Sequence, residues 1–300
     1  MIGKIFGMLK ASAPQEGGEF NIKEMILHHL ADSNEWETPF GTVHLPQWEP
    51  VHIGPISMDF SITRHVLFMM IAATLVAILL IYTGQKAKRE KAAGAERGPK
   101  GATNVVEAII LFIRDEVALR NIGHGGERFV PYIVSVFFFV LFCNMLGLLP
   151  WGSSPTGNIS VTAALALMTF ITVEISGMLT LGAKGYAKTI FYVPHGMNPV
   201  MAGIMLIIMT PVEFLGKLTK PFALAIRLYA NMTAGHAVVL ALTGLAVMAS
   251  LAGAKFISIA IAPVLMATAI MLLEIFVALL QAYIFAMLSS VFIGLIRHAH

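Results

Sequence analysis

The longest apolar run in the chain places the strongest constraint on its fold. Residues 256–296 continue for about 40 residues without a cluster of glycine and proline, and Glu274 is the only formally charged residue among them. One helix of that length would be about 60 Å long, whereas the hydrocarbon core of a bilayer is about 30 Å thick. A hidden hairpin would need turn residues that this run lacks. We therefore expect one long, strongly tilted membrane helix.

The composition of the whole chain agrees with a core that is built in lipid. Hydrophobic residues make up 57% of the 300 residues, charged residues make up only 12%, and the mean hydropathy is +0.79. Soluble domains carry roughly 25% charged residues. These features predict an all-α integral membrane protein with about five transmembrane helices, at residues 62–82, 130–149, 160–182, 200–250 and 256–296.

Residues 104–122 differ from the predicted spans because they mix apolar positions with five charged residues. This pattern is typical of a helix that lies on the membrane surface instead of crossing the bilayer. The predicted architecture is therefore about five transmembrane helices plus one membrane-surface helix.

The distribution of charge along the chain predicts its orientation. Residues 83–102 hold six lysines and arginines against two glutamates, and the positive-inside rule assigns such a loop to the cytoplasm. The tail of residues 1–60 is then an extracytoplasmic segment, and residues 61–300 form the membrane domain. We expect a multi-pass protein of the cell (inner) membrane with its N-terminus outside and its C-terminus in the cytoplasm.

The last two helices, residues 200–296, are expected to pack against each other and to join near residues 250–255. Between Pro221 and Ala254 the only formal charge is Arg227. A charged side chain at the bilayer centre costs at least about 2.5 to 3.5 kcal/mol, so either packing or function has to offset that cost. Charges buried in membrane proteins usually line pathways, which favours a functional role for this arginine.

Other polar residues on the first of these two helices fall at separate places. Asn231 lies one turn after Arg227 on the same face, while His236 points about 180° away from it. Glu213 precedes Arg227 by fourteen residues, which corresponds to about 21 Å along a continuous helix. The sequence therefore predicts one polar position near Glu213, a second at Arg227 and a third near His236.

The last helix contributes further polar residues to the membrane domain. Glu274 and Gln281 are seven residues apart and share one face of that helix. A structural ion pair between Glu274 and Arg227 is an alternative to a functional role for the two charges. Glu174, in the third predicted span, is another intramembrane acid, and the sequence pattern alone does not place it.

Structural interpretations also stay open for the remaining polar residues. Lys217 lies one turn after Glu213 and could pair with it. Lys217 and Lys220 could also extend their head groups to the cytoplasmic interface. Hydrogen bonds between helices or within the core are the alternative roles for Asn231, His236 and Gln281.

No motif of a soluble enzyme competes with the membrane interpretation. The sequence contains no phosphate-binding loop and no nucleophile elbow of the GxSxG type. Its histidines and its single cysteine do not show the spacing of a metal site. We expect no cofactor, no metal ion and no nucleic-acid partner.

Three stretches carry a resemblance to a known family. The sequences "PVEFLGKLTKPFALAIRLYANMTAGH" (211–236), "EIFVALLQAYIFAMLSSVFIG" (274–294) and "NMLGLLP" (144–150) resemble the a subunit of the F-type ATP synthase, which is the stator half of its membrane motor. The resemblance covers roughly residues 130–296. Residues 1–55 show no motif that belongs to it.

The resemblance implies roles for the matching residues only. Arg227 matches the essential arginine that faces the carboxylates of the rotating c-ring, and His236 with Glu274 matches a coupled pair that lines the access channel. Glu213 matches an acid on the cytoplasmic side. The polar residues that match positions beside the arginine are Asn231 and Gln281, and Glu174 is added to the proton pathway as an intramembrane acid.

The resemblance also implies a mechanism and a set of partners. Two offset aqueous half-channels would bring protons to the c-ring carboxylates, and the tilted helical hairpin of residues 200–296 would pack on that ring. The expected partners are the c-ring subunits, the peripheral-stalk b subunits, the rest of the ATP synthase, protons and membrane lipid. ATP chemistry would take place in other subunits, so the chain is not expected to be catalytic alone.

Two other functions compete with this one. A secondary transporter would use Arg227 to bind an anionic substrate, but such proteins often contain two related halves, and neither "RLYAN" nor "LQAYIF" occurs a second time. A purely structural membrane scaffold gives no reason for polar groups spread along the last two helices. The histidine–glutamate pair favours protons over sodium ions as the coupling ion.

Overall fold

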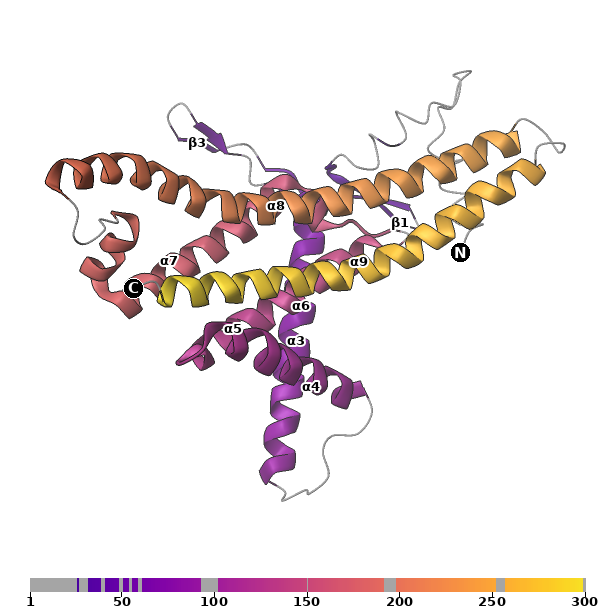
Figure 1. Cartoon of the computed structure of the whole chain (residues 1–300). Coiled ribbons are helices and arrows are strands. Elements are labelled where there is room, and N and C mark those ends of the chain that lie inside the picture. The colour runs from indigo at the N-terminus through magenta and orange to yellow at the C-terminus, as the bar shows by residue number, and fades with distance from the viewer. Residues whose placement is uncertain are drawn as a thin grey trace. The chain divides into compact units, whose positions relative to one another are not determined.

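Five long helices dominate the computed structural model (Figure 1), which describes residues 26, 32–38, 41–48, 51–53, 56–58, 61–92, 102–149, 151–191, 198–251 and 257–298. All five are long and apolar enough to cross a membrane. They are α3 (Arg64–Ala92), α6 (Val130–Gly147), α7 (Ile159–Ile190), α8 (Pro199–Leu251) and α9 (Ile257–Arg297). The prediction of an all-α integral membrane protein with about five transmembrane helices is confirmed.

Two of these helices extend beyond the predicted spans. α3 continues through Ala92, ten residues past the predicted end, because the lysines, the arginine, the glutamate and the alanines of this extension are good helix formers. The first half of the segment 83–102 is therefore helical, while residues 93–101 lie outside the described residues. α7 continues to Ile190, but Gly182 has φ 69° and ψ 167°, so the helical geometry is interrupted where the predicted span ends.

Residues 102–122 form one interrupted helix that has two chemically different faces. It consists of α4 (Ala102–Phe112), the π-helical segment η1 (Ile113–Leu119) and α5 (Arg120–Ile122). Four apolar side chains on one face are buried in the chain, and four charged side chains on the other face are exposed. The amphipathic pattern of this predicted surface helix is thus present. The buried residues are Ile113, Val117, Ala118 and Ile122, and the exposed ones are Arg114, Asp115, Glu116 and Arg120.

The N-terminal tail contains two short antiparallel β-hairpins that the sequence did not predict. Strand β1 (Glu35–Thr38) pairs with β2 (Gly41–His44), and β3 (Val51–Ile53) pairs with β4 (Ile56–Met58). The first hairpin is attached to the helical part of the chain by Trp36, whose indole N–H donates to the carbonyl of Trp151 at 2.8 Å. The ring of Trp36 also meets the ring of Phe68 edge to face.

The chain divides into two compact units, each of which contains part of α8 and part of α9. One unit comprises Met1–Ala73, Leu141–Asn158 and Leu228–Leu280, and the other comprises Thr74–Val140, Ile159–Arg227 and Gln281–His300. We call them the first and the second unit.

Within each unit α9 runs beside α8 in the opposite direction. Glu274 contacts His236 in the first unit, and Phe292 lies under the ammonium of Lys220 in the second. The expected long helical hairpin is therefore present; residues 252–256, which contain most of the predicted joint, lie outside the described residues.

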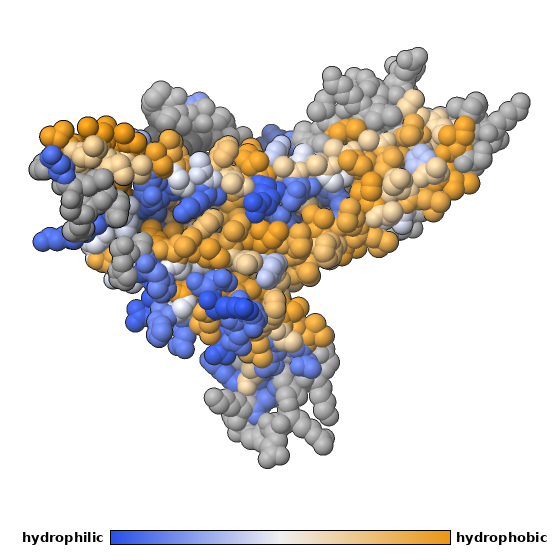
Figure 2. Space-filling view, viewed as in Figure 1, coloured by the Kyte–Doolittle hydropathy of each residue, from blue (hydrophilic) through white to orange (hydrophobic). Residues whose placement is uncertain are grey.

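The outer surfaces of α8 and α9 are largely apolar. Figure 2 shows hydrophobic side chains along both long helices. In an apolar stretch of 18 residues, only 22% of the residues of α8 and 11% of those of α9 are buried within the chain. Large apolar surfaces of this kind face lipid or a partner protein.

Candidate functional site

A histidine and a glutamate meet between α8 and α9 in the first unit. The Nδ1 atom of His236 lies 3.5 Å from the Oε1 atom of Glu274, and their side chains are 25% and 12% exposed. Gly235 provides the space for this contact, because a Cβ atom at that position would overlap the Glu274 carboxylate. The pairing that the family resemblance implied for these two residues is present in the structure.

The other nitrogen of the histidine determines how the pair can exchange a proton. His236 Nε2 lies 2.9 Å from the carbonyl oxygen of Gly147. A carbonyl only accepts hydrogen bonds, so Nε2 carries a proton, and in the neutral ring Nδ1 is then an acceptor that faces Glu274. One proton can therefore be held either by the Glu274 carboxyl group or by His236 Nδ1.

A buried hydrogen-bond network next to the pair joins the end of α6 to α9. The Asn144 amide donates to the carbonyl of Ala278 at 3.3 Å, and the Thr156 hydroxyl donates to the Asn144 side-chain oxygen at 2.7 Å. Ser154 in turn lies 2.8 Å from the Thr156 hydroxyl. These contacts position the segment of α9 that begins four residues after Glu274. Sequence reasoning noted Asn144 only as part of a family motif and did not assign it this partner.

The second unit contains a different cluster, centred on Lys217 of α8. Its ammonium lies 3.7 Å from the Glu174 carboxylate of α7, and the two side chains are 11% and 13% exposed. The ammonium also lies 3.4 Å from the Tyr186 hydroxyl, 3.5 Å from the Thr189 hydroxyl and 4.4 Å from the centre of the Tyr186 ring. Among the described residues Lys217 forms its ion pair with Glu174 and not with Glu213, so that predicted alternative is wrong.

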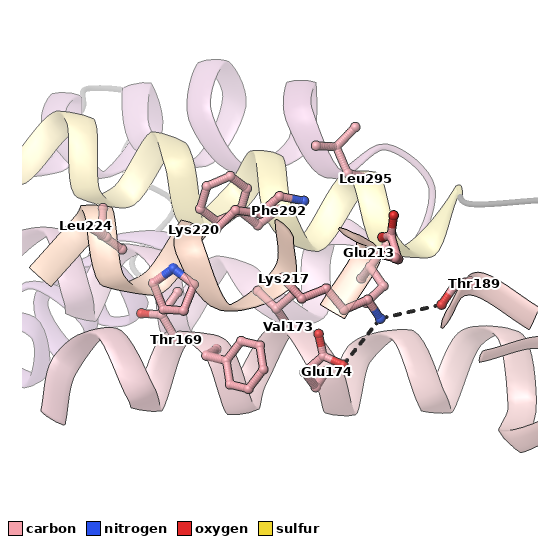
Figure 3. Close-up of a pocket in the computed structure, with 13 residues that line it drawn as sticks. Thr169, Val173, Glu174, Thr189, Glu213, Lys217, Lys220, Leu224, Phe292 and Leu295 are labelled. Atoms are coloured by element: carbon pink, nitrogen blue, oxygen red, sulfur yellow. Dashed lines mark hydrogen bonds and ion pairs between the residues drawn. The ribbon is translucent and has the colours of Figure 1, made fainter. Parts of the chain in front are cut away.

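This lysine cluster lines a cavity of about 220 Å³ (Figure 3). Glu174 approaches Lys217 from one wall, and Glu213 contributes an exposed carboxylate to the same cavity. The Lys220 ammonium lies 5.5 Å from the centre of the Phe292 ring on α9. The cavity therefore combines two acids and two lysines with apolar walls, and it holds Glu174, which the sequence pattern could not place.

The remaining predicted site residues have contrasting environments. Arg227 and Asn231 are exposed and lie one turn apart on α8. Gln281 is buried, with 2% of its surface exposed. Across the described part of the chain, no group of three or more histidine, cysteine, aspartate or glutamate side chains is arranged to hold a metal ion.

Comparisons with known proteins all find members of one family. Residues 66–294 match the model of the family described as "ATP synthase A chain". The chain is 44% identical to ATP synthase subunit a of Chloroherpeton thalassium over 272 residues, which cover 90% of this chain and 75% of that protein. It is 42% identical to ATP synthase subunit a 2 of Chlorobaculum tepidum over 294 residues, or 97% of this chain and 78% of that protein. It is 45% identical to ATP synthase subunit a of Myxococcus xanthus over 240 residues, or 79% of this chain and 73% of that protein.

Proposed function

Because the chain belongs to the ATP synthase subunit a family, it is a proton-translocating membrane component of Fo that is not catalytic by itself, and we propose how its residues perform that role. In the proposal, two offset aqueous half-channels lead to the carboxylates of a rotating c-ring, and proton flow between them drives rotation. The observation that carries the proposal is an exposed arginine in apolar sequence, with one polar cluster before it and another after it along α8.

Arg227 is the proposed contact with the ring. Its guanidinium is not deprotonated in proteins, so it cannot relay a proton, but it attracts an ionised carboxylate. A ring carboxylate that faces lipid must be neutral, whereas one that faces Arg227 can release its proton. Asn231 is exposed one turn later on the same helix, and we assign it and the buried Gln281 to the polar surroundings of the arginine.

The His236–Glu274 pair is the proposed entrance from the outside. His236 Nδ1 and the Glu274 carboxylate face each other at 3.5 Å, so either group can hold a proton that arrives at the pair. A proton that arrives at this pair can therefore leave again toward the ring. Each proton that crosses 100 mV releases about 2.3 kcal/mol, which is the energy available for rotation.

The cavity of the second unit is the proposed exit to the cytoplasm. Glu213 is exposed and lines the cavity, so it can accept a proton and pass it to water. Glu174 belongs to this pathway through its ion pair with Lys217, which holds negative and positive charge at fixed places in the cavity wall.

The orientation and the partners complete the proposal. We assign residues 1–60 to the extracytoplasmic side, the basic segment 83–102 to the cytoplasm, and the C-terminus to the cytoplasm, on the basis of charge distribution. The c-ring packs on residues 200–296, and the b subunits of the peripheral stalk hold the protein still.

The native Cys143 is buried, so introduced cysteines can be labelled selectively. Cysteines at the exposed Thr42 and Lys88 should label from opposite sides; labelling from one side refutes the orientation.

Replacement of Arg227 by alanine tests the central part of the proposal. The Arg227→Ala variant should lose proton-driven ATP synthesis and ATP-driven pumping, because no fixed cation holds the ionised ring carboxylate. It should also leak protons passively, because no charge separates the two half-channels. Arg227→Lys should work poorly, since an ammonium lacks the planar guanidinium and loses its proton more readily when desolvated.

The measurement is proton flux in vesicles that hold verified, fully assembled complex. Arg120→Ala is the control, because it removes an exposed arginine whose partner is Glu116, one turn earlier on the same helix. Its pumping should match that of the unmodified protein. Normal ATP-driven pumping by Arg227→Ala would remove the arginine from the mechanism, and failure of that variant to assemble would indicate a structural anchor instead.

A further inference from the structure

A buried histidine lies in the first unit, outside the proposed pathway residues. His65, at the start of α3, is only 5% exposed. Its Nδ1 lies 2.9 Å from the Ser153 hydroxyl, and its Nε2 lies 3.9 Å from the Asp32 carboxylate. Asp32 also accepts a hydrogen bond from the backbone N–H of His65 at 3.4 Å. The ring is therefore held between an acid of the N-terminal tail and a hydroxyl of the segment that follows α6.

Asp32 links this histidine to the solvent-exposed surface of the unit. Its side chain is 29% exposed, in contrast to the 7% exposed side chain of His65. The amide of Asn158 donates to its second carboxylate oxygen at 3.4 Å, which fixes the orientation of the carboxylate. The 3.9 Å between Asp32 and His65 Nε2 is longer than a hydrogen bond, so a proton would move inward from the exposed acid to the buried histidine through one bridging water.

A small cavity is lined by both His65 and His236, the histidine of the proposed entrance pair. The cavity has a volume of about 40 Å³, and its lining includes His65, Ser154, Thr233 and His236. Since a water molecule needs about 10 to 15 Å³ of such volume, about three waters fit. The Thr233 hydroxyl is buried and has no hydrogen-bond partner among the described residues, as expected for a group that binds water in the cavity.

We propose that Asp32 and His65 form an outer proton relay, which delivers protons through water in this cavity to His236 and Glu274. This inference rests on the proposed function, because it extends the entrance half-channel outward by one titratable pair. A proton taken up at His65 Nε2 is balanced by one that Nδ1 gives to the Ser153 hydroxyl, and that hydroxyl passes its own proton to the cavity water. The ring is then neutral with its proton on Nε2, and it has to turn over and bring that N–H back toward Ser153 before it can take up the next proton.

The charges around the relay are suited to rapid transfer. Arg64 also lines the cavity and repels a proton that stays on His65, while Asp32 supplies the opposite charge on the tail side. On the inner side His236 faces the same cavity and is itself in contact with Glu274. Asp32 therefore favours the arrival of a proton at His65, and Arg64 limits how long the ring keeps it.

Two substitutions of equal size separate a relay from a structural hydrogen bond. His65→Gln keeps hydrogen bonding but cannot take up a proton, whereas His65→Glu introduces a titratable group beside Asp32. We expect ATP synthesis by assembled complex in vesicles to fall about ten-fold in His65→Gln, and His65→Glu to keep most of the lost rate. A structural role predicts the reverse order, because a second carboxylate next to Asp32 disturbs packing more than an amide does.

The dependence on outer pH provides an independent readout. At a fixed total proton-motive force, the loss in His65→Gln should be larger at about pH 8 than at about pH 6 in the entrance-side compartment, because a relay matters most when protons are scarce. The matched control is His44→Gln, which removes an exposed histidine that lies 3.4 Å from Glu35. Its rate should equal that of the unmodified protein at both pH values.

A parallel His236→Ala variant distinguishes failure of the relay from failure of the proposed function. If His236→Ala blocks synthesis while His65→Gln is unaffected, only the relay is refuted. If neither variant slows synthesis, the proposed entrance itself is wrong. Should His65→Gln assemble poorly, Asp32→Asn replaces it as the test, because the Asp32 side chain is more exposed than that of His65; an unchanged rate in Asp32→Asn would then overturn the relay.

Discussion

The His236–Glu274 pair of the first unit and the Glu174–Lys217 pair of the second contain the same formal ingredients, one acid and one base, yet they are built differently. The carbonyl of Gly147 fixes one ring nitrogen of His236 and leaves the other facing the acid. Lys217 directs its ammonium to a carboxylate and two hydroxyls at once and also lies over an aromatic ring.

This difference in surroundings follows the chemistry of the two bases. A histidine ordinarily loses its proton near pH 6.5 and a lysine near pH 10.4, so only the histidine exchanges a proton readily around neutral pH. The first pair is therefore suited to relay protons. The second pair, with its ion pair and its two hydroxyl contacts, is suited to hold the wall of the cavity in which Glu213 is exposed.

Loss of either member of the first pair should have the largest effect. His236→Ala and Glu274→Gln should each reduce ATP-driven proton flux by about 10- to 100-fold, because each removes one half of a proton-exchange site. The double variant should be impaired less than the product of the two single effects. Flux in vesicles with verified assembly is the measurement, and strictly multiplicative effects would show that the two residues act independently.

A single methyl group should separate the first pair and have a smaller effect. In Gly235→Ala the new Cβ overlaps the Glu274 carboxylate, which must move away from its present position near His236. We expect flux to fall by up to about ten-fold, equivalent to about 1.4 kcal/mol in the barrier. Gly216→Ala is the matched control on α8, because a Cβ there meets no other atom within 4 Å. Equal flux in both variants would mean that the exact position of Glu274 is unimportant.

Changes to the second pair should affect assembly more than flux. Lys217→Met leaves the Glu174 carboxylate without its cation and should lower the amount of assembled complex, whereas the double variant Lys217→Met/Glu174→Gln should recover part of it. The expected coupling is about 1 kcal/mol, measured as complex yield and thermal stability in a double-mutant cycle. Lys220→Met serves as a control, because its ammonium lies over Phe292 instead. A large loss of flux in fully assembled Lys217→Met would instead make Lys217 part of the proton path.

The ends of the helices show where local sequence patterns lose their predictive power. Hydropathy located all five membrane helices, but it ended α3 near residue 82, although the helix continues to Ala92. Hydropathy follows the contact with lipid, while helix formation continues as long as the residues favour it. At Gly182 the end of the apolar run and the end of regular helical geometry coincide, because a glycine with a positive φ interrupts the helix there.

The sequence by itself determined that the protein is a membrane protein, that its last two helices are too long to stand upright, and that Arg227 is a charge in an apolar helix. These properties depend on composition and on spacing within one helix, so they can be read along the chain. Only the tertiary structure decided that Lys217 pairs with Glu174 instead of Glu213, and that His65 meets Asp32 and shares a cavity with His236. Each of these contacts joins separate segments of the chain, and the helix periodicity of one segment carries no information about which face of another segment it will meet.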